Sequence, residues 1–182
     1  MEKTEMYDSF EDRLEAVLVK ICTEENLLGG QILSSVDLDD KWHEWIKAYL
    51  ADAISEYNAY PEVAFAWAGY VGLGLAKMWD VDWEQGKMLK YTDFYGPRGF
   101  DDMDDFITEK VLGFPLGSPE AGKMATILRR CADEAISLIR HDNVEAGSVD
   151  AFHVFVRGVE ALRRIGSSIG LFGLGYRLQR VQ

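Results

Sequence analysis

Three aspartates with helical spacing are the residues of this chain best suited to metal chemistry. Asp101, Asp102 and Asp105 stand at D-D-x-x-D in the stretch "DDMDD". Residues four positions apart share a helix face, and carboxylate oxygens are the ligands that Mg²⁺ prefers. The spacing therefore suits a divalent metal that would join the protein to a phosphate or diphosphate substrate, as an alternative to a purely structural role.

The same spacing resembles the Mg²⁺–diphosphate motif of the isoprenoid synthases, which are all-α enzymes. The resemblance covers five residues, and the chain carries no recognisable second metal motif of that family. An acidic first turn also suits the dipole at the start of a helix. We expect the aspartates to serve this structural role and keep a metal-dependent enzyme as the alternative.

Two histidines each follow an aspartate by three residues. Asp40 precedes His43, and Asp150 precedes His153. This spacing puts a carboxylate and an imidazole on one helix face, as in the Glu-x-x-His ligands of ferritin-like di-iron bundles. A di-metal site built from these four residues is a weaker alternative. We expect no cofactor, and a divalent metal only under these two alternatives.

A near match to the phosphate loop of nucleotide-binding proteins lies at Gly117–Lys123. The range fits G-x-x-x-x-G-K, but Met124 stands where a hydroxyl residue would bind Mg²⁺. Ser118 and Pro119 are instead typical of a helix start, with serine as the N-cap and proline in the first turn. We expect a helix to begin here and no nucleotide to bind.

Aromatic residues gather in one part of the chain. All five tryptophans lie between Trp42 and Trp83, and the helical periodicity fades over residues 79–100. Loops carry binding residues more often than cores do, and exposed aromatic side chains are typical of protein interfaces. We expect a partner-binding surface formed by Trp79, Trp83, Phe94, Tyr95 and Phe100.

Apolar residues recur with helical spacing in nearly every segment, and no long alternation of polar and apolar residues predicts a strand. About six helices with short connections indicate an all-α bundle that forms one domain over residues 1–182. The stretches "GYVGLG" and "GLFGLG" place three glycines in each of two helices, expected near 61–79 and 148–180. Glycine inside a helix costs about 1 kcal/mol, so we expect these helices to pack closely together.

The charge is strongly negative and unevenly distributed. The net charge is −12; residues 1–110 carry 24 acidic and 10 basic side chains, whereas residues 111–182 carry 7 and 9. Because an acidic surface repels phosphate backbones, we expect no nucleic-acid partner. The basic residues of the last helix are expected to pack against the acidic part of the chain or a second copy. They are Arg163, Arg164, Arg177 and Arg180.

Several features indicate a cytoplasmic protein. The two cysteines, Cys22 and Cys131, form no C-x-x-C motif, so we expect reduced thiols in the core. The first sixteen residues are acidic and lack the apolar region of a signal peptide. The longest uncharged run, residues 63–76, spans about 21 Å as a helix, too short for a bilayer core of about 30 Å. We therefore expect no transmembrane segment.

No complete catalytic constellation can be recognised among these residues. The chain is therefore predicted to be a non-enzymatic protein-binding or assembly module that binds a protein partner or self-associates.

Overall fold

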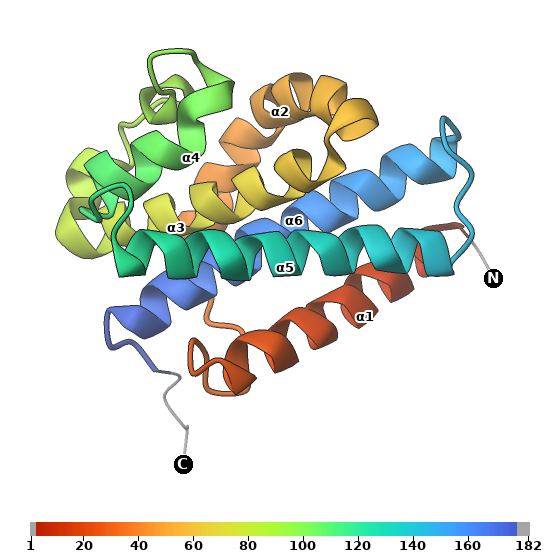
Figure 1. The fold of residues 1–182 in the computed structure, drawn as a ribbon, viewed down its shortest axis with the longest axis horizontal. Helices are drawn as coiled ribbons and strands as arrows, with labels where there is room; N and C mark the ends of the chain where they lie inside the picture. Colours follow the sequence, from red (N-terminus) through yellow and green to blue (C-terminus); the bar gives the residue numbers. More distant parts are fainter. Residues whose placement is uncertain (1–2, 178–182) are drawn as a thin grey trace.

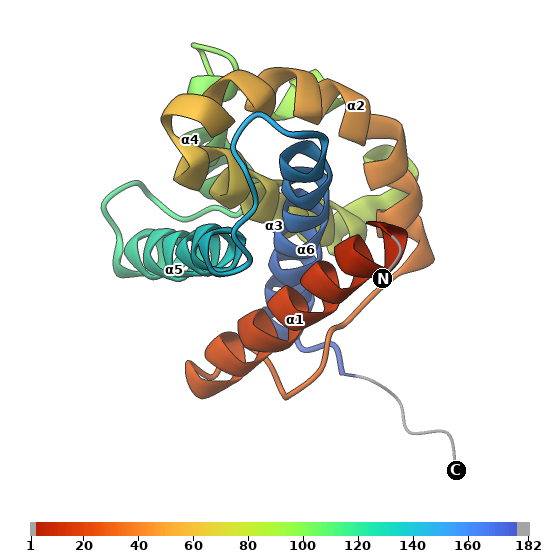
Figure 2. The same ribbon diagram turned by 90° about the vertical axis from the view of Figure 1, so that its right-hand side faces the viewer.

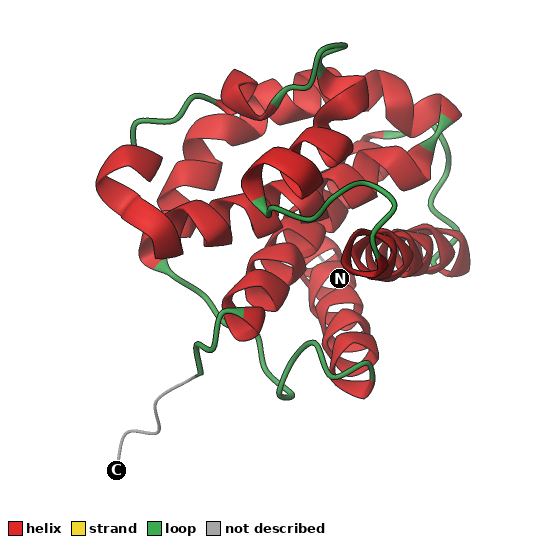
Figure 3. Ribbon diagram, turned by 60° about the vertical axis from the view of Figure 1, so that its left-hand side comes forward, coloured by secondary structure: helices red, strands yellow, loops and turns green. Residues whose placement is uncertain are grey.

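The computed structural model describes residues 3–177, which form six α-helices joined by short connections (Figure 1). The helices are α1 (Lys3–Glu24), α2 (Val36–Ala59), α3 (Pro61–Gly86), α4 (Met103–Phe106), α5 (Pro119–His141) and α6 (Val149–Gly173). Two 3₁₀ turns precede α4 and a π-helical turn follows it: Tyr91–Phe94, Phe100–Asp102 and Ile107–Val111. Figure 3 shows helices and loops and no strand within residues 3–177. The all-α prediction is confirmed.

Helix α6 lies at the centre of the bundle, with α1, α2, α3 and α5 around it (Figure 2). Its most extensive contact is with α3. Gly69 of α3 lies against Gly166 of α6, and Ala76 lies against Gly170, so the two helices run in the same direction. Both helices are buried along much of their length, α3 over Ala64–Ala76 and α6 over Ala151–Leu171.

Glycine allows the backbones of α3 and α6 to touch. A Cβ atom added at Gly72 would lie 2.6 Å from the backbone nitrogen of Ser167. One added at Gly166 would lie 2.8 Å from the carbonyl carbon of Gly69. Backbone atoms cannot move aside as side chains can, so these positions exclude any larger residue. The predicted close packing of the two glycine-containing helices is confirmed.

The second glycine stretch contributes less to this contact than its sequence suggests. Only Gly170 meets α3, where an added Cβ would lie 2.8 Å from the Cβ of Ala76. Gly173 and Gly175 face open space, and Gly175 has a positive φ of 99° just beyond the end of α6. The last glycine therefore serves the helix end, a common place for a left-handed residue.

The first helix begins and ends earlier than its apolar pattern suggests. The pattern predicts a helix from about Ser9 to Leu28, whereas α1 ends at Glu24. Asn26 adopts a φ of 61° and turns the chain before the expected Gly29-Gly30 stop. Asparagine is the residue that most often replaces glycine at this position.

Ion pairs join the basic side chains of α6 to the acidic N-terminal helices. Arg163 donates to Asp39 of α2 at 2.7 Å, and Arg164 donates to Glu11 of α1 at 2.6 Å. The expected packing of these two arginines against the acidic part of the chain is confirmed. Arg180 lies outside the described residues. None of the helices described within residues 3–177 is long and apolar enough to cross a membrane.

Candidate functional site

A kink near the end of α3 lies beside two exposed apolar side chains, Val81 and Met88. Asp82 has extended backbone angles (φ −167°, ψ 98°) inside an otherwise helical segment. Its carboxylate accepts hydrogen bonds from the backbone nitrogens of Glu84 at 3.1 Å and Gln85 at 3.4 Å. This arrangement starts a final helical turn that ends at Gly86. The helix predicted to stop near Trp79 instead turns and continues.

Four apolar side chains around this kink are exposed or half-buried, and we call them the kink patch: Trp79, Val81, Trp83 and Met88. Val81 is 64% exposed and Met88 is 74% exposed, while the two tryptophans are half-buried. The ring of Trp83 covers Gly86, where an added Cβ would lie 2.6 Å from a ring carbon. The kink region therefore exposes Val81 and Met88, while Trp79 and Trp83 pack partly against the core.

Trp79 is held in place from two sides. Its indole nitrogen donates a hydrogen bond to Asp37 of α2 at 3.0 Å. Its ring packs edge-on against Tyr176, with ring centroids 5.1 Å apart, and the Tyr176 hydroxyl donates to Asp80 at 2.7 Å. The bond to Asp80 also raises the pKa of Tyr176. Trp79 therefore has a fixed orientation between α2 and the end of α6.

Charges of both signs lie around the kink patch. Asp80, Asp82 and Glu84 are exposed within the same stretch of chain. Lys87 and Lys90 are exposed there too, and the ammonium of Lys87 pairs with Glu84 at 2.8 Å. The apolar side chains are therefore bordered by polar and charged groups, as at the rim of a protein interface.

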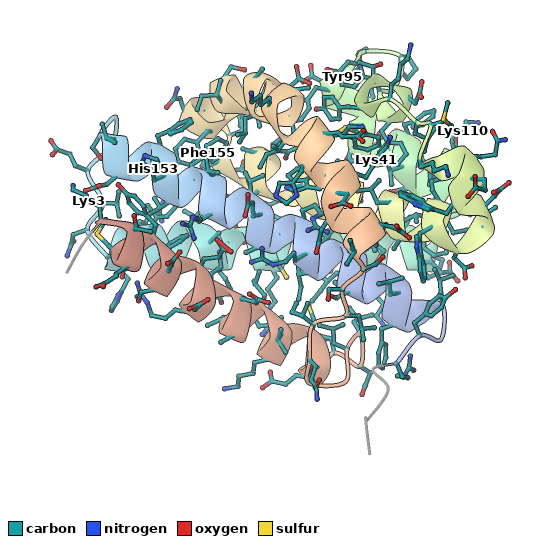
Figure 4. All side chains as sticks on the ribbon, turned by 180° about the vertical axis from the view of Figure 1, so that it is seen from behind. Lys3, Lys41, Tyr95, Lys110, His153 and Phe155 are labelled. Atoms are coloured by element: carbon teal, nitrogen blue, oxygen red, sulfur yellow. The ribbon has the colours of Figure 1, made fainter. Side chains whose placement is uncertain are left out.

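The other three predicted binding residues lie in the loop beside α2 (Figure 4). Phe94 is 2% exposed and packs edge-on against Trp45, so it belongs to the core. Phe100 and Tyr95 are half-buried, and the Tyr95 hydroxyl donates to Asp52 of α2. Burial and this hydrogen bond raise the pKa of Tyr95 to about 12. Of the five predicted residues, Trp79 and Trp83 therefore lie at the kink, and the other three hold the loop against α2.

The acidic cluster is divided among different environments. Arg98 donates hydrogen bonds to the carboxylate of Asp102 from Nη2 at 2.7 Å and from Nε at 3.1 Å. These bonds lower the pKa of Asp102. Asp101 and Asp105 are exposed. Asp104, which the D-D-x-x-D pattern passes over, is half-buried, and burial raises its pKa to about 6.

The aspartate–histidine pair on α6 lies beside the start of α1. Asp150 accepts hydrogen bonds from the Tyr7 hydroxyl at 2.6 Å and from the Lys3 ammonium at 2.9 Å. These two donors lower the pKa of Asp150. The ring of His153 stacks on Tyr7, with centroids 4.6 Å apart. Asp150 therefore already serves as the acceptor that joins α1 to α6.

The pair on α2 is separate from the pair on α6. Asp40 and His43 are exposed, and Nδ1 of His43 lies 2.8 Å from the carbonyl oxygen of Asp39. Figure 4 labels Lys41 of the same helix far from His153 at the start of α6. Across residues 3–177, no three His, Cys, Asp or Glu side chains converge into a group that could hold a metal ion.

The phosphate-loop-like stretch forms a capped helix start, as predicted. The Ser118 hydroxyl accepts a hydrogen bond from the backbone nitrogen of Ala121 at 3.2 Å, and Pro119 is the first residue of α5. Gly117 makes the preceding turn with a φ of 85°. Gly122 already lies in the helix, so the stretch does not form an open loop of the phosphate-binding kind.

A cavity of about 320 Å³ lies between α3, the start of α5 and the end of α6. Its walls are almost entirely apolar, and Lys77 is its one charged lining residue. The sequence pattern did not point to this cavity, because its walls come from segments far apart in the chain.

No protein-family model, characterised protein or solved structure was found to match the chain.

Proposed function

We propose that this chain is a protein-binding module that uses the kink patch to bind a partner segment with apolar and basic side chains. The observation that carries the proposal is the exposure of Val81 and Met88 beside two half-buried tryptophans. Tryptophan and methionine are enriched in protein interfaces relative to the rest of the surface. The proposal keeps Trp79 and Trp83 as binding residues and adds the two exposed side chains.

The physical gain from binding would come from burying the apolar side chains. Full burial of a valine or methionine side chain is worth about 1.5–3 kcal/mol. Because Trp79 is already fixed by Asp37 and Tyr176, little conformational freedom remains to be lost there. The net charge of −12 on the whole chain would favour a basic partner and speed its approach.

Site-specific photocrosslinking tests the proposal. A photoreactive benzoylphenylalanine is placed, one position at a time, at Val81, at Met88 and at Val149, and the protein is crosslinked in the cells that produce it. Val149 is the matched control, because it is 71% exposed but lies at the opposite end of the central helix pair. We expect the same discrete adduct from positions 81 and 88 and none of that mass from position 149.

The identity of the adduct then distinguishes the two forms of the proposal. A second copy of the chain in the adduct indicates an assembly module, and a different protein indicates a partner-binding module. Equal adducts from all three positions, or none from any, would contradict a binding surface at the kink.

A metal-dependent enzyme acting through Asp101, Asp102 and Asp105 stays the alternative. It has less support, because the Asp102 carboxylate is already held by the Arg98 guanidinium. Calorimetric titration with Mg²⁺ and Mn²⁺ separates the two proposals, since only the alternative requires heat of metal binding.

A further inference from the structure

The chain has two cysteines, and the fold brings them together. Cys22 lies on α1 and Cys131 lies on α5, separated by 109 positions in the sequence. Their Sγ atoms are 3.9 Å apart, and both side chains are fully buried as free thiols. The binding surface at the kink uses neither of them. This meeting of the chain's only two thiols is therefore a separate chemical feature of the molecule.

We propose that Cys22 and Cys131 are a peroxide-sensitive modification site, at which oxidation forms an intramolecular disulfide between α1 and α5. A disulfide requires the two sulfur atoms to lie about 2.05 Å apart. The sulfurs must therefore approach by roughly 2 Å.

The two thiols differ in their readiness to react. The contact between the two thiols, in which either sulfur can be the donor, lowers the pKa of Cys22 and raises that of Cys131. The guanidinium of Arg130 also favours the Cys22 thiolate, whereas the carboxylate of Glu25 opposes it. On the other sulfur, the charge of Glu134 further disfavours ionisation. Because the thiolate is the nucleophile, Cys22 attacks the peroxide and Cys131 resolves the intermediate.

Two surface cavities are lined by residues that lie close to the cysteines in the sequence. A cavity of about 380 Å³ is lined by Glu25 and Arg130, each within one helical turn of a cysteine. The ion pair between them is 3.4 Å long, and both side chains are about half exposed. A second cavity, of about 260 Å³, includes Glu134 on its wall, one turn beyond Cys131. Neither cysteine lines either of these cavities and both are fully buried, so the proposal requires local opening of the contact between α1 and α5 to admit hydrogen peroxide.

The reaction balances with one molecule of hydrogen peroxide as the oxidant. The Cys22 thiolate attacks one peroxide oxygen, so that an S–O bond forms and the O–O bond breaks. The released hydroxide takes up a proton and leaves as water. The sulfur of Cys131 then attacks the Cys22 sulfenic acid, the S–S bond forms, and the S–O bond breaks. The second hydroxide leaves as water with the Cys131 proton, and the two sulfurs have lost two electrons to the two oxygens.

Intact-mass spectrometry of the full chain after treatment with hydrogen peroxide tests this proposal. We expect a monomer that has lost two hydrogen atoms, and a proteolytic digest in which the peptides containing Cys22 and Cys131 are linked. Because the bond closes a loop of more than 100 residues, the melting temperature of the oxidised protein should rise by about 10 °C. Treatment with dithiothreitol should reverse both changes.

Two single variants, Cys22→Ala and Cys131→Ala, are the matched controls. Each lacks one partner, so peroxide should add oxygen to the remaining thiol without raising the melting temperature. Circular dichroism of the reduced variants verifies that they fold, and reversible formation of the linked peptide in the parent protein gives a second, independent measure. Disulfide-linked dimers, or addition of oxygen to both cysteines of the parent chain in place of the cross-link, would overturn the proposal.

Discussion

At the scale of single residues, Asp104 differs most from what its surroundings in the sequence suggest. It is one of four aspartates in this cluster and lies half-buried near Tyr70, whereas the buried Asp102 is held by Arg98. Burial, followed by the nearby charge of Asp105, raises its pKa to about 6. The folded protein therefore binds a proton at Asp104 more tightly than the unfolded chain does, and ionisation of this carboxyl opposes folding.

The pH dependence of stability follows from this shift. As the pH rises from about 4 to about 6, Asp104 loses its proton first in the unfolded chain, so the free energy of unfolding should fall by about 2 kcal/mol. The variant Asp104→Asn should lack this decline and be more stable than the parent at pH 7. Urea unfolding at a series of pH values measures the difference.

The control for this experiment is Asp101→Asn, which removes the same charge from an exposed position in the same cluster. It should keep the pH dependence of the parent protein. If Asp104→Asn and Asp101→Asn behave alike, the burial of Asp104 is not the cause.

At the scale of helices, the contact between α3 and α6 sets the positions of the helices packed around α6. Helix α6 lies in the middle of the bundle, so a change in its distance from α3 alters every other contact it makes (Figure 2). At Gly72, the atoms that an added Cβ would meet belong to the backbone of α6. The two helices would have to move apart to accept even one methyl group.

Two glycine-to-alanine substitutions test this contact. Gly72→Ala should lower the free energy of unfolding by about 3 kcal/mol, because it forces two packed backbones apart. Gly122→Ala should instead raise it by about 0.5–1 kcal/mol, because an added Cβ in α5 meets nothing within 4 Å and alanine favours the helix. Chemical denaturation of both variants gives the two values. Similar values for the two substitutions would contradict the close contact.

At the scale of the whole molecule, ion pairs join the last helix to the acidic N-terminal part of the chain. The first 110 residues carry the excess of acid, and α6 brings arginines into contact with them. Arg164 pairs with Glu11 and also lies 3.3 Å from Glu15, while Arg157 pairs with Glu11 at 3.1 Å. The side chains of Arg164 and Glu11 are 21% and 12% exposed, so solvent screens this network less than it screens a surface pair.

A double-mutant cycle measures what this network contributes. Arg164→Met should destabilise the protein by about 1–3 kcal/mol, because it leaves Glu11 with one partner fewer in a poorly solvated place. Adding Glu11→Gln should cost less than the sum of the single changes, with a coupling energy of about 1 kcal/mol. The exposed pair of Lys87 and Glu84 is the control and should couple by no more than about 0.5 kcal/mol. Equal coupling energies in the two cycles would contradict the conclusion that the half-buried network stabilises the protein more than an exposed ion pair does.

The sequence by itself determined the features that depend on neighbouring residues. Helical periodicity predicted the all-α class, and Ser118 with Pro119 predicted a helix start, because caps act within one turn. The glycine stretches predicted a close helix contact, since glycine inside a helix needs a reason in packing. The excess of acid also predicted where Arg163 and Arg164 would find partners.

The tertiary structure decided which residues face the core, the solvent or each other. It placed Phe94 in the core, left Met88 exposed, and buried Asp102 against Arg98 while leaving Asp104 half-buried. It also set Cys22 beside Cys131 across 109 positions. Local patterns fix how a residue relates to those three or four positions away. The pairing of distant surfaces depends on how whole helices pack, so the sequence indicated only Trp79 and Trp83 of the kink patch and did not predict the thiol pair.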